Sequence, residues 1–464
     1  NNLTYAFVQI NKITMKKNLL KVLALLALST INYAQTNPAI TKWLQNTTVT
    51  GKYYTSGNST AISNNILVNC QQVRYSSNWV YVNATGIPAY PVGPFTGDGN
   101  PNNAGNQNAI FKFPLNPTQN TGTPTSTSAG NIGVFINGVA MFDYRDGVSW
   151  KSSTGAFAGG PIGGSGDGVW NRDAIVYEKL GFDCSKGHPA GTNYHHHQNP
   201  SAFDLDLNTV STICNLYDAD GLYAINTTQH SPLIGFAYDG FPIYGAYGYL
   251  NTNGTGGITR MKSGYQKRNI TVRSLYADGT DVTDGPPVNT TYPIGSFKED
   301  YEYIAHPTEP DYLDVHNGRF CITPEYPNGI YAYFCTVDAN HNSAYPYIVG
   351  PTYYGNKTAA KVTTVTEATS TFILSNNEFS IDDTSIKIFP NPASQLIAIQ
   401  VNGLVENTIA IDLIDINGKL IKSTLINVGQ SIAYFDVQDI YDGTYIIKFT
   451  SGNTTISNQV IIKK

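Results

Sequence analysis

The chain has 464 residues, which is enough for two or three domains of about 150 residues each. Charged residues make up only 13% of it and the formal net charge is −5, so the sequence lacks the basic field that nucleic-acid binding needs. It is rich in tyrosine (32) and glycine (43), and this composition favours an extracellular β-rich protein over a cytosolic helical one.

The N-terminal region has the layout of an export signal. Residues 1–14 contain no initiating methionine, and we interpret them as translation upstream of a start at Met15. Residues 15–34 begin with Met15, Lys16 and Lys17 and continue with an apolar run over 22–28 and a polar segment ending at Ala34, which predicts a signal peptide. No other apolar run reaches about 18 residues, so we expect no transmembrane segment in the mature chain.

Short alternating runs follow from Thr50 onward. Residues 80–82 and 110–113 have the alternation of strands, and residues 132–143 predict a strand pair that turns at Asn137-Gly138.

The next segments differ in character. Residues 150–168 are rich in glycine and lack the spacing of a phosphate-binding loop, so we interpret them as a flexible connector, with a substrate lid as the alternative. Residues 170–180 are the strongest helix candidate, with Asp167 as N-cap and Gly181 as the stop.

A histidine-rich stretch then contains the candidate metal ligands. His195, His196 and His197 follow Tyr194 directly, and His188 lies seven residues before the first of them. In an extended segment side chains alternate between faces, so His195 and His197 should share one face and His196 should point the other way. Two imidazoles on one face form half of a metal site.

A complete site needs one or two more ligands. His188 is near in sequence, and Asp239 ends a strand-like run over residues 234–244. More distant donors are also available: His230, His316 and His341. Imidazole ligands suit zinc or copper, and an added carboxylate keeps zinc, iron or manganese open.

The same residues also fit roles that need no metal. The histidines could hydrogen-bond a loop backbone, and Asp239 could cap the turn before Gly240. A Ser-His-Asp hydrolase is a weaker hypothesis, because Ser201 and Ser231 lie near but outside any Gly-x-Ser-x-Gly elbow. No carboxylate pair for glycoside cleavage is visible. The abundant tyrosines indicate sheet packing before sugar binding.

The five cysteines form an odd set, so at least one thiol should stay unpaired. Cys321 and Cys335 flank the turn signal Pro327-Asn328-Gly329, and this arrangement predicts a cross-strand disulfide. Cys184 with Cys214 is the second predicted pair.

The middle of the chain resembles the YHYH-domain family of secreted bacterial proteins. Tyr194-His195-His196-His197 is similar to the family's Tyr-His-Tyr-His signature, with His196 where the family has tyrosine. Further family-like stretches are Asp183-Cys184 with Gly187-His188, residues 234–245 and residues 323–334. The resemblance covers a core over residues 61–354 of a domain over 35–356, and it implies membership of the family without an activity.

The C-terminal region changes composition. Residues 357–383 are rich in Thr, Ser and Ala over much of their length and predict a linker. Residues 384–464 show clean period-2 strands, which predict a small β-sandwich. This module resembles the type A sorting domain of the type IX secretion system, through Phe389-Pro390-Asn391-Pro392, residues 415–419 and Gly443-Thr444-Tyr445. The resemblance implies export by that machinery across the outer membrane of a Bacteroidota cell.

We therefore expect a mainly β protein, with a large irregular β-rich domain containing few short helices and a C-terminal β-sandwich. It should be secreted or held on the outer cell surface. The hypothesis is that His188, His195, His197 and Asp239 bind a transition metal, copper or zinc, in a metal-dependent hydrolase or a redox enzyme. The alternative is a non-catalytic binding or surface protein with a structural metal or none.

Overall fold

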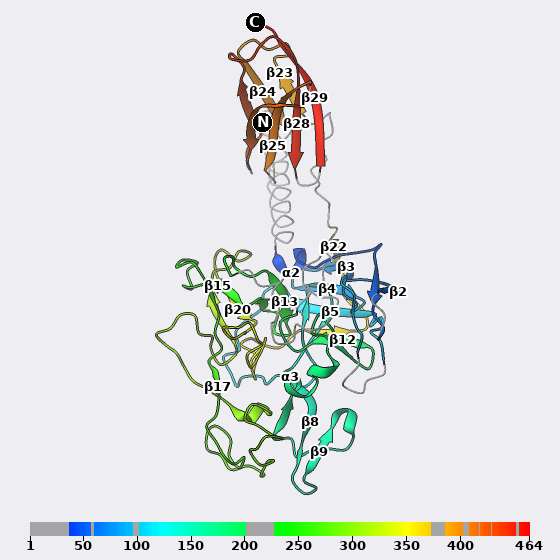
Figure 1. Cartoon of the computed structure of the whole chain (residues 1–464), viewed down its shortest axis with the longest axis vertical. Helices are drawn as coiled ribbons and strands as arrows, with labels where there is room; N and C mark the ends of the chain where they lie inside the picture. The colour runs from blue at the N-terminus through cyan, green and yellow to red at the C-terminus, as the bar shows by residue number, and fades with distance from the viewer. Residues whose placement is uncertain are drawn as a thin grey trace, which may run out of the picture. The chain divides into compact units, whose positions relative to one another are not determined.

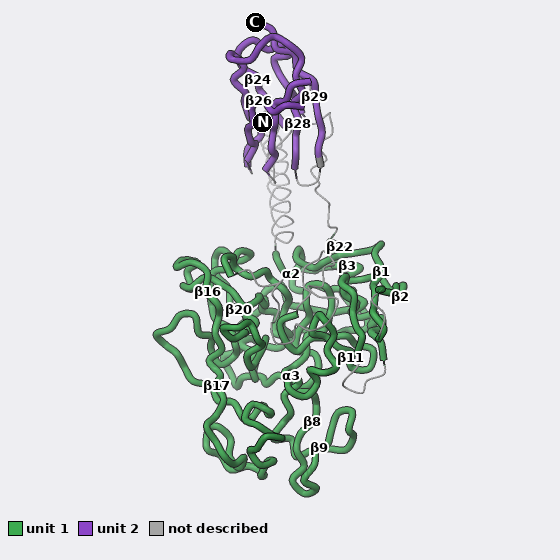
Figure 2. Tube along the Cα trace, in the orientation of Figure 1, with its two compact units in different colours: residues 1–372 green, residues 373–464 purple. Residues whose placement is uncertain are grey.

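A computed structural model describes residues 37–56, 60–95, 102–200, 227–372, 386–401, 408–416, 418–427, 429–451 and 454–464. The predicted signal peptide lies outside these residues. The chain divides into two compact units, residues 1–372 and 373–464 (Figure 2).

The main sheet of the first unit has eight strands in the order β11-β12-β7-β6-β13-β14-β20-β19. Neighbours are antiparallel except for the parallel pairs β12–β7 and β14–β20. The strands are β6 (Asn131–Phe135), β7 (Ala140–Phe142), β11 (His188–Ala190), β12 (Asn193–His196), β13 (Leu233–Ala237), β14 (Pro242–Tyr244), β19 (Gly318–Cys321) and β20 (Ile330–Phe334). The predicted turn between β6 and β7 is confirmed, and Gly138 takes a φ of +78° there, which glycine adopts without steric cost.

A second sheet has five antiparallel strands in the order β21-β5-β4-β3-β22. They are β3 (Cys70–Tyr75), β4 (Trp79–Ala84), β5 (Ala109–Pro114), β21 (Ala360–Val362) and β22 (Ser370–Phe372). The predicted strands at 80–82 and 110–113 are confirmed. The two edge strands come from the start of the segment predicted as a linker, where Phe372 packs against the core.

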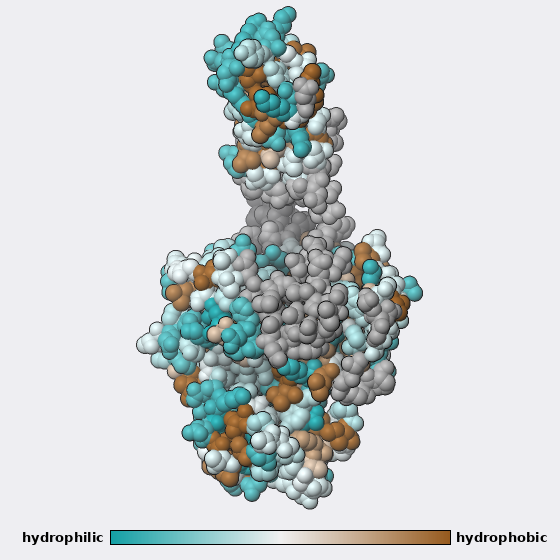
Figure 3. Space-filling view, viewed as in Figure 1, coloured by the Kyte–Doolittle hydropathy of each residue, from teal (hydrophilic) through white to brown (hydrophobic). Residues whose placement is uncertain are grey.

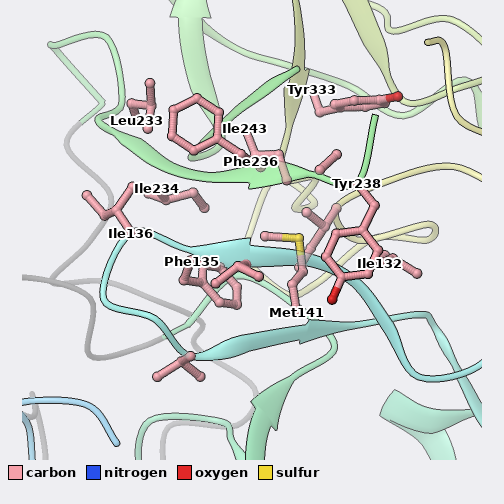
Figure 4. Close-up of a cluster of buried hydrophobic side chains, with 14 of the residues drawn as sticks. Ile132, Phe135, Ile136, Met141, Leu233, Ile234, Phe236, Tyr238, Ile243 and Tyr333 are labelled. Carbon is pink, nitrogen blue, oxygen red and sulfur yellow. The ribbon is translucent and has the colours of Figure 1, made fainter. Parts of the chain in front are cut away.

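Apolar side chains of both sheets form one core. Trp43 lies between them, with its ring centroid 5.5 Å from that of Phe113 on β5 and 5.3 Å from that of Phe236 on β13. Figure 4 shows the part of this core that strands β6, β7, β13, β14 and β20 contribute. Burial of each such side chain stabilises the fold by about 1.5–3 kcal/mol.

A smaller sheet, in the order β10-β8-β9, lies next to a short helix. Its elements are β8 (Arg145–Lys151), β9 (Ala156–Gly159), β10 (Asn171–Asp173), α3 (Ala174–Tyr177) and the 3₁₀ turn Lys179–Gly181. The predicted helix over 170–180 is therefore wrong in its first half, and its N-cap is Asp173 instead of Asp167. Tertiary packing explains the difference, because Trp170 is fully buried and residues 171–173 pair with β8.

The other described elements of this unit are short (Figure 1). They are α2 (Pro38–Thr41), β1 (Thr50–Tyr53), β2 (Ile62–Leu67), β15 (Tyr247–Tyr249), β16 (Ile258–Arg260), β17 (Tyr265–Lys267), β18 (Tyr301–Tyr303) and the 3₁₀ turns Gly160–Ile162 and Lys298–Asp300. No helix among the described residues is long and apolar enough to cross a membrane. Figure 3 shows hydrophobic side chains scattered among hydrophilic ones on the viewed face of this unit.

The predicted disulfide between Cys321 and Cys335 is wrong, because both thiols are free and buried. The hairpin register explains this: Cys321 faces Ile330 across β19 and β20, and Cys335 lies beyond the end of β20. Cys184 is disulfide-bonded, and its predicted partner Cys214 lies outside the described residues.

The second unit is a β-sandwich, as predicted. One sheet has the order β23-β24-β27 and the other β26-β25-β28-β29. Their bounds are β23 (Ile386–Phe389), β24 (Leu396–Val401), β25 (Ile409–Asp415), β26 (Leu420–Ile426), β27 (Ile432–Asp436), β28 (Gly443–Ser451) and β29 (Thr454–Ile462). Alternate residues of the facing strands fill its core, including Ile397, Ile399, Leu413 and Phe449.

Candidate metal centre

Strands β11 and β12 form a tight hairpin that carries the predicted histidines. His188 pairs with His195 across the two strands, and Gly191 turns the chain between them with a φ of +61°. His197 follows β12 directly and returns to the face of His195, because alternate residues of an extended chain share a face. Three predicted ligands thus come from ten consecutive residues.

The opposite face of β12 anchors the hairpin in the core. The Tyr194 hydroxyl donates to the buried Asp183 carboxylate at 2.9 and 3.1 Å. His196 Nε2 lies 2.8 Å from the Tyr90 hydroxyl, and burial lowers the pKa of His196 to about 3, so the ring is neutral. His196 therefore points away from His195, as the alternation predicts.

The three imidazoles of the hairpin's other face converge on one point. Each of His188, His195 and His197 offers a ligand atom within 4.8 Å of the other two, and all three side chains are buried. Nε2 of His195 lies 3.0 Å from Nε2 of His197. Histidine nitrogens bind zinc at about 2.0–2.1 Å, so two adjacent ligand atoms on one ion lie about 2.9–3.4 Å apart. The observed separation fits that range.

Hydrogen bonds on the far side of two rings fix their tautomers. Nδ1 of His195 lies 2.9 Å from the Asn193 carbonyl oxygen, and Nδ1 of His197 lies 2.5 Å from the Asp143 carbonyl oxygen. A carbonyl oxygen only accepts, so each Nδ1 carries a proton, and a ring that holds no second proton presents a lone pair at Nε2. Burial and the neighbouring imidazoles hold the pKa of His195 well below its usual range, which disfavours a shared proton. A metal cation would satisfy both lone pairs.

Glu178, at the end of α3, adds a carboxylate to the group. Its Oε2 atom lies 3.2 Å from His197 Nε2 and 3.4 Å from His188 Nε2. This oxygen is buried and accepts no hydrogen bond of good geometry from the described residues. Burial raises the pKa of Glu178, but hydrogen bonds and positive charge from His188 and His197 in their protonated form outweigh it and lower the pKa to about 2. The group is thus an ionised carboxylate, which is the form that metals bind.

The ligands predicted from the sequence did not include Glu178. The one feature of the sequence that pointed to it is that it places a carboxylate in the predicted helical segment that precedes His188. That segment was expected to be a regular helix, and nothing in its pattern showed that the chain would turn there and aim the side chain at the hairpin.

Aromatic rings hold the imidazoles in place. The Phe142 ring stacks on His195 with a centroid distance of 3.7 Å. The Phe182 ring packs against His188 at 4.8 Å and against His197 at 6.2 Å. Rings fixed by such packing keep their nitrogens aimed at one point without a bound ion.

A cavity of about 570 Å³ opens on this cluster. Glu178, His188, His195 and His197 line it, together with small residues of neighbouring loops and Arg145. The Arg145 guanidinium also pairs with the buried Asp143 carboxylate at 2.6 Å. Cavities of about 300–1,000 Å³ are typical of sites for small molecules.

The structure does not bring Asp239 to the histidines. Its buried carboxylate accepts hydrogen bonds from the Tyr333 hydroxyl at 2.6 Å, the Gly355 amide at 2.8 Å and the Phe241 amide at 3.2 Å. It holds the turn between β13 and β14, which is the structural alternative considered for it. Metal binding by any of the four predicted residues stays a prediction.

The more distant donors also lie elsewhere. His230 packs between Tyr244 and Tyr249, His316 bonds Thr352, and His341 bonds Tyr247. For the serine hypothesis, Ser231 accepts a backbone bond from Tyr247, and Ser201 lies outside the described residues.

The fold and site define a β-rich protein with a histidine-lined cavity in its first unit. The sequence model of the YHYH protein family matches residues 110–355, and the chain belongs to this family. The model of the secretion system C-terminal sorting domain matches residues 387–463. The protein is therefore secreted or held on the outer surface through the type IX secretion machinery. A search of curated proteins finds no match.

Proposed function

We propose that His188, His195, His197 and Glu178 bind one transition-metal ion. The observation that supports this most is the convergence of three buried imidazoles whose ligand atoms lie within 4.8 Å of one another. Carbonyl partners on the Nδ1 side orient two of the rings, as outer-shell groups do at metal sites. Three imidazoles with one carboxylate suit zinc, iron or manganese, and the imidazoles also suit copper.

We further propose that the site is catalytic instead of structural. A structural zinc ion is tetrahedral and closed by four protein ligands, so an ion held here by three histidines and Glu178 is catalytic only if it keeps a fifth position open to water or substrate. The cavity of about 570 Å³ beside the histidines gives substrate that access. A bound metal would supply either an activated water for hydrolysis or a redox couple. The chain's own residues would orient the ion, exclude bulk water with Phe142 and Phe182, and position substrate along the cavity wall.

Metal analysis tests the binding step. Protein purified without a histidine tag should contain about one metal ion per chain, and His195→Ala/His197→Ala should contain almost none. A matched control, His316→Ala/His341→Ala, removes two histidines of the same unit and should keep the ion. Equal metal content in the wild type and the His195/His197 variant would refute the proposal.

A second experiment separates a catalytic from a structural site. Protein loaded with Co²⁺ should change its visible spectrum when azide is added, because azide enters an open coordination position. An unchanged spectrum with a stoichiometric ion would show a closed shell. The protein would then be a non-catalytic surface protein with a structural metal.

A further inference from the structure

A second cavity, of about 630 Å³, lies in the first unit and shares no lining residue with the metal cavity. Three aromatic side chains form its base. The rings of Tyr331 and Tyr354 stack in parallel with a centroid distance of 3.6 Å. The ring of Phe241 lies 5.3 Å from that of Tyr354. Tyr331 and Phe241 are buried, with 2% and 5% of each exposed. They support the partly exposed ring of Tyr354, which presents the aromatic surface here.

A fourth ring stands at the edge of this surface. Phe320 lies on the edge strand β19, and 61% of it is exposed. A Cβ added to Gly329 would come within 2.8 Å of the Phe320 ring, and one added to Gly355 within 2.6 Å of the Phe241 ring. Glycine at these two positions therefore leaves room for the rings of Phe320 and Phe241.

The rim of the cavity is polar and neutral. The exposed side chains of Asn116, Gln119 and Asn328 line it, and none of their amide groups bonds to another described residue. The one charged residue in the lining is Glu325, whose carboxylate pairs with Lys42 at 3.1 Å and accepts from a tyrosine hydroxyl at 2.9 Å. The cavity thus offers no unpaired charge among the described residues.

We propose that this second cavity is a binding site for a neutral saccharide. The C–H face of a sugar ring packs against aromatic faces, where the ring quadrupole is negative. Sugar hydroxyls both donate and accept hydrogen bonds, and so do the carboxamides of the rim. A proline-rich peptide would also pack on aromatic rings, but its backbone offers mainly carbonyl acceptors. The mixed donors and acceptors of the rim favour the saccharide.

Affinity electrophoresis of the full chain tests this proposal. Native gels would contain one of four soluble neutral polysaccharides: hydroxyethylcellulose, xyloglucan, galactomannan or laminarin. At least one should retard the wild-type protein. Phe320→Ala should weaken that binding about tenfold or more, as expected for loss of an aromatic contact. The matched control Tyr276→Ala removes another exposed aromatic residue of the same unit, which does not line the cavity, and should bind as the wild type does.

Two further measurements separate saccharide binding from metal binding and from loss of folding. The His195→Ala/His197→Ala variant should bind the same polysaccharide, which separates this site from the metal proposal. Unfolding midpoints of all variants should confirm that they fold. Migration unchanged by every polysaccharide would overturn the proposal, as would equal retardation of Phe320→Ala and wild type. Binding of a proline-rich peptide, lost in Phe320→Ala, without polysaccharide binding would identify a peptide site instead.

Discussion

Asp183 should control metal affinity without touching the metal. Its carboxylate accepts hydrogen bonds from the amides of Ser185 and Gly187 at 2.9 and 3.0 Å, from the amide of Gly93 at 2.9 Å, and from the Tyr194 hydroxyl. These bonds fix the loop that leads into β11 and the rear face of β12. In Asp183→Asn a side-chain NH2 group replaces one of the two carboxylate oxygens. This NH2 group then faces a hydrogen-bond donor of the protein, which loses its acceptor.

The expected losses follow from that geometry. An unmatched buried polar group costs about 1–3 kcal/mol of folding free energy. Outer-shell substitutions at metal sites reduce affinity by about 10–100-fold, and we expect a loss in this range because the anchored loop delivers His188. Zinc affinity would be measured by competition with a chelating dye, and stability by urea unfolding of the metal-free protein.

Asp239→Asn provides a matched control. Asp239 is equally buried and also accepts bonds from a tyrosine hydroxyl and two backbone amides. Its substitution should cost a similar amount of stability and leave zinc affinity within about twofold, since it does not join the hairpin. The reasoning fails if the two variants lose zinc affinity equally, or if Asp183→Asn binds zinc as the wild type does.

Three other substitutions test separate parts of the structure. Glu178→Gln should lower the retained metal after dialysis at least tenfold if the carboxylate is a ligand, and full retention would exclude that role. Burial raises the pKa of Asp173 to about 7, so the folded state holds a proton that the unfolded state releases near pH 4. The contribution of Asp173 to the free energy of unfolding should therefore fall as pH rises from about 4 to 7. The difference in the free energy of unfolding between the wild type and Asp173→Asn, measured by urea unfolding, should change between pH 4.5 and 8, and an equal difference at both pH values would contradict the pKa. Phe236→Ala should lower the free energy of unfolding, measured in urea, by about 3–5 kcal/mol, because Phe236 is buried. Phe320→Ala should lower it by less than about 0.5 kcal/mol, because Phe320 is exposed. Comparable losses in the two variants would contradict the assigned core.

Local patterns of the sequence predicted a large part of the fold. Strand alternation located the strands at 80–82 and 110–113, and the Asn137-Gly138 signal located a hairpin turn. The same alternation placed His195 and His197 on one face. These features depend on neighbouring residues, so a single sequence contains them.

Features set by distant contacts were not predictable in the same way. Trp170 takes a φ of +56° because its ring is buried and its indole donates to the Thr283 carbonyl. The register of β19 and β20 separates Cys321 from Cys335, although a turn signal lies between them. Glu178 reaches the histidines only because α3 ends after one turn.

The buried thiols have a consequence for how this protein matures. The pKa values of Cys70 and Cys335 are raised by burial, so both stay protonated and react poorly with oxidants. That protection exists only after the sheets have closed over them. In an oxidising compartment, folding therefore competes with mispairing, and a denatured sample refolded without a reductant should accumulate disulfide-linked chains.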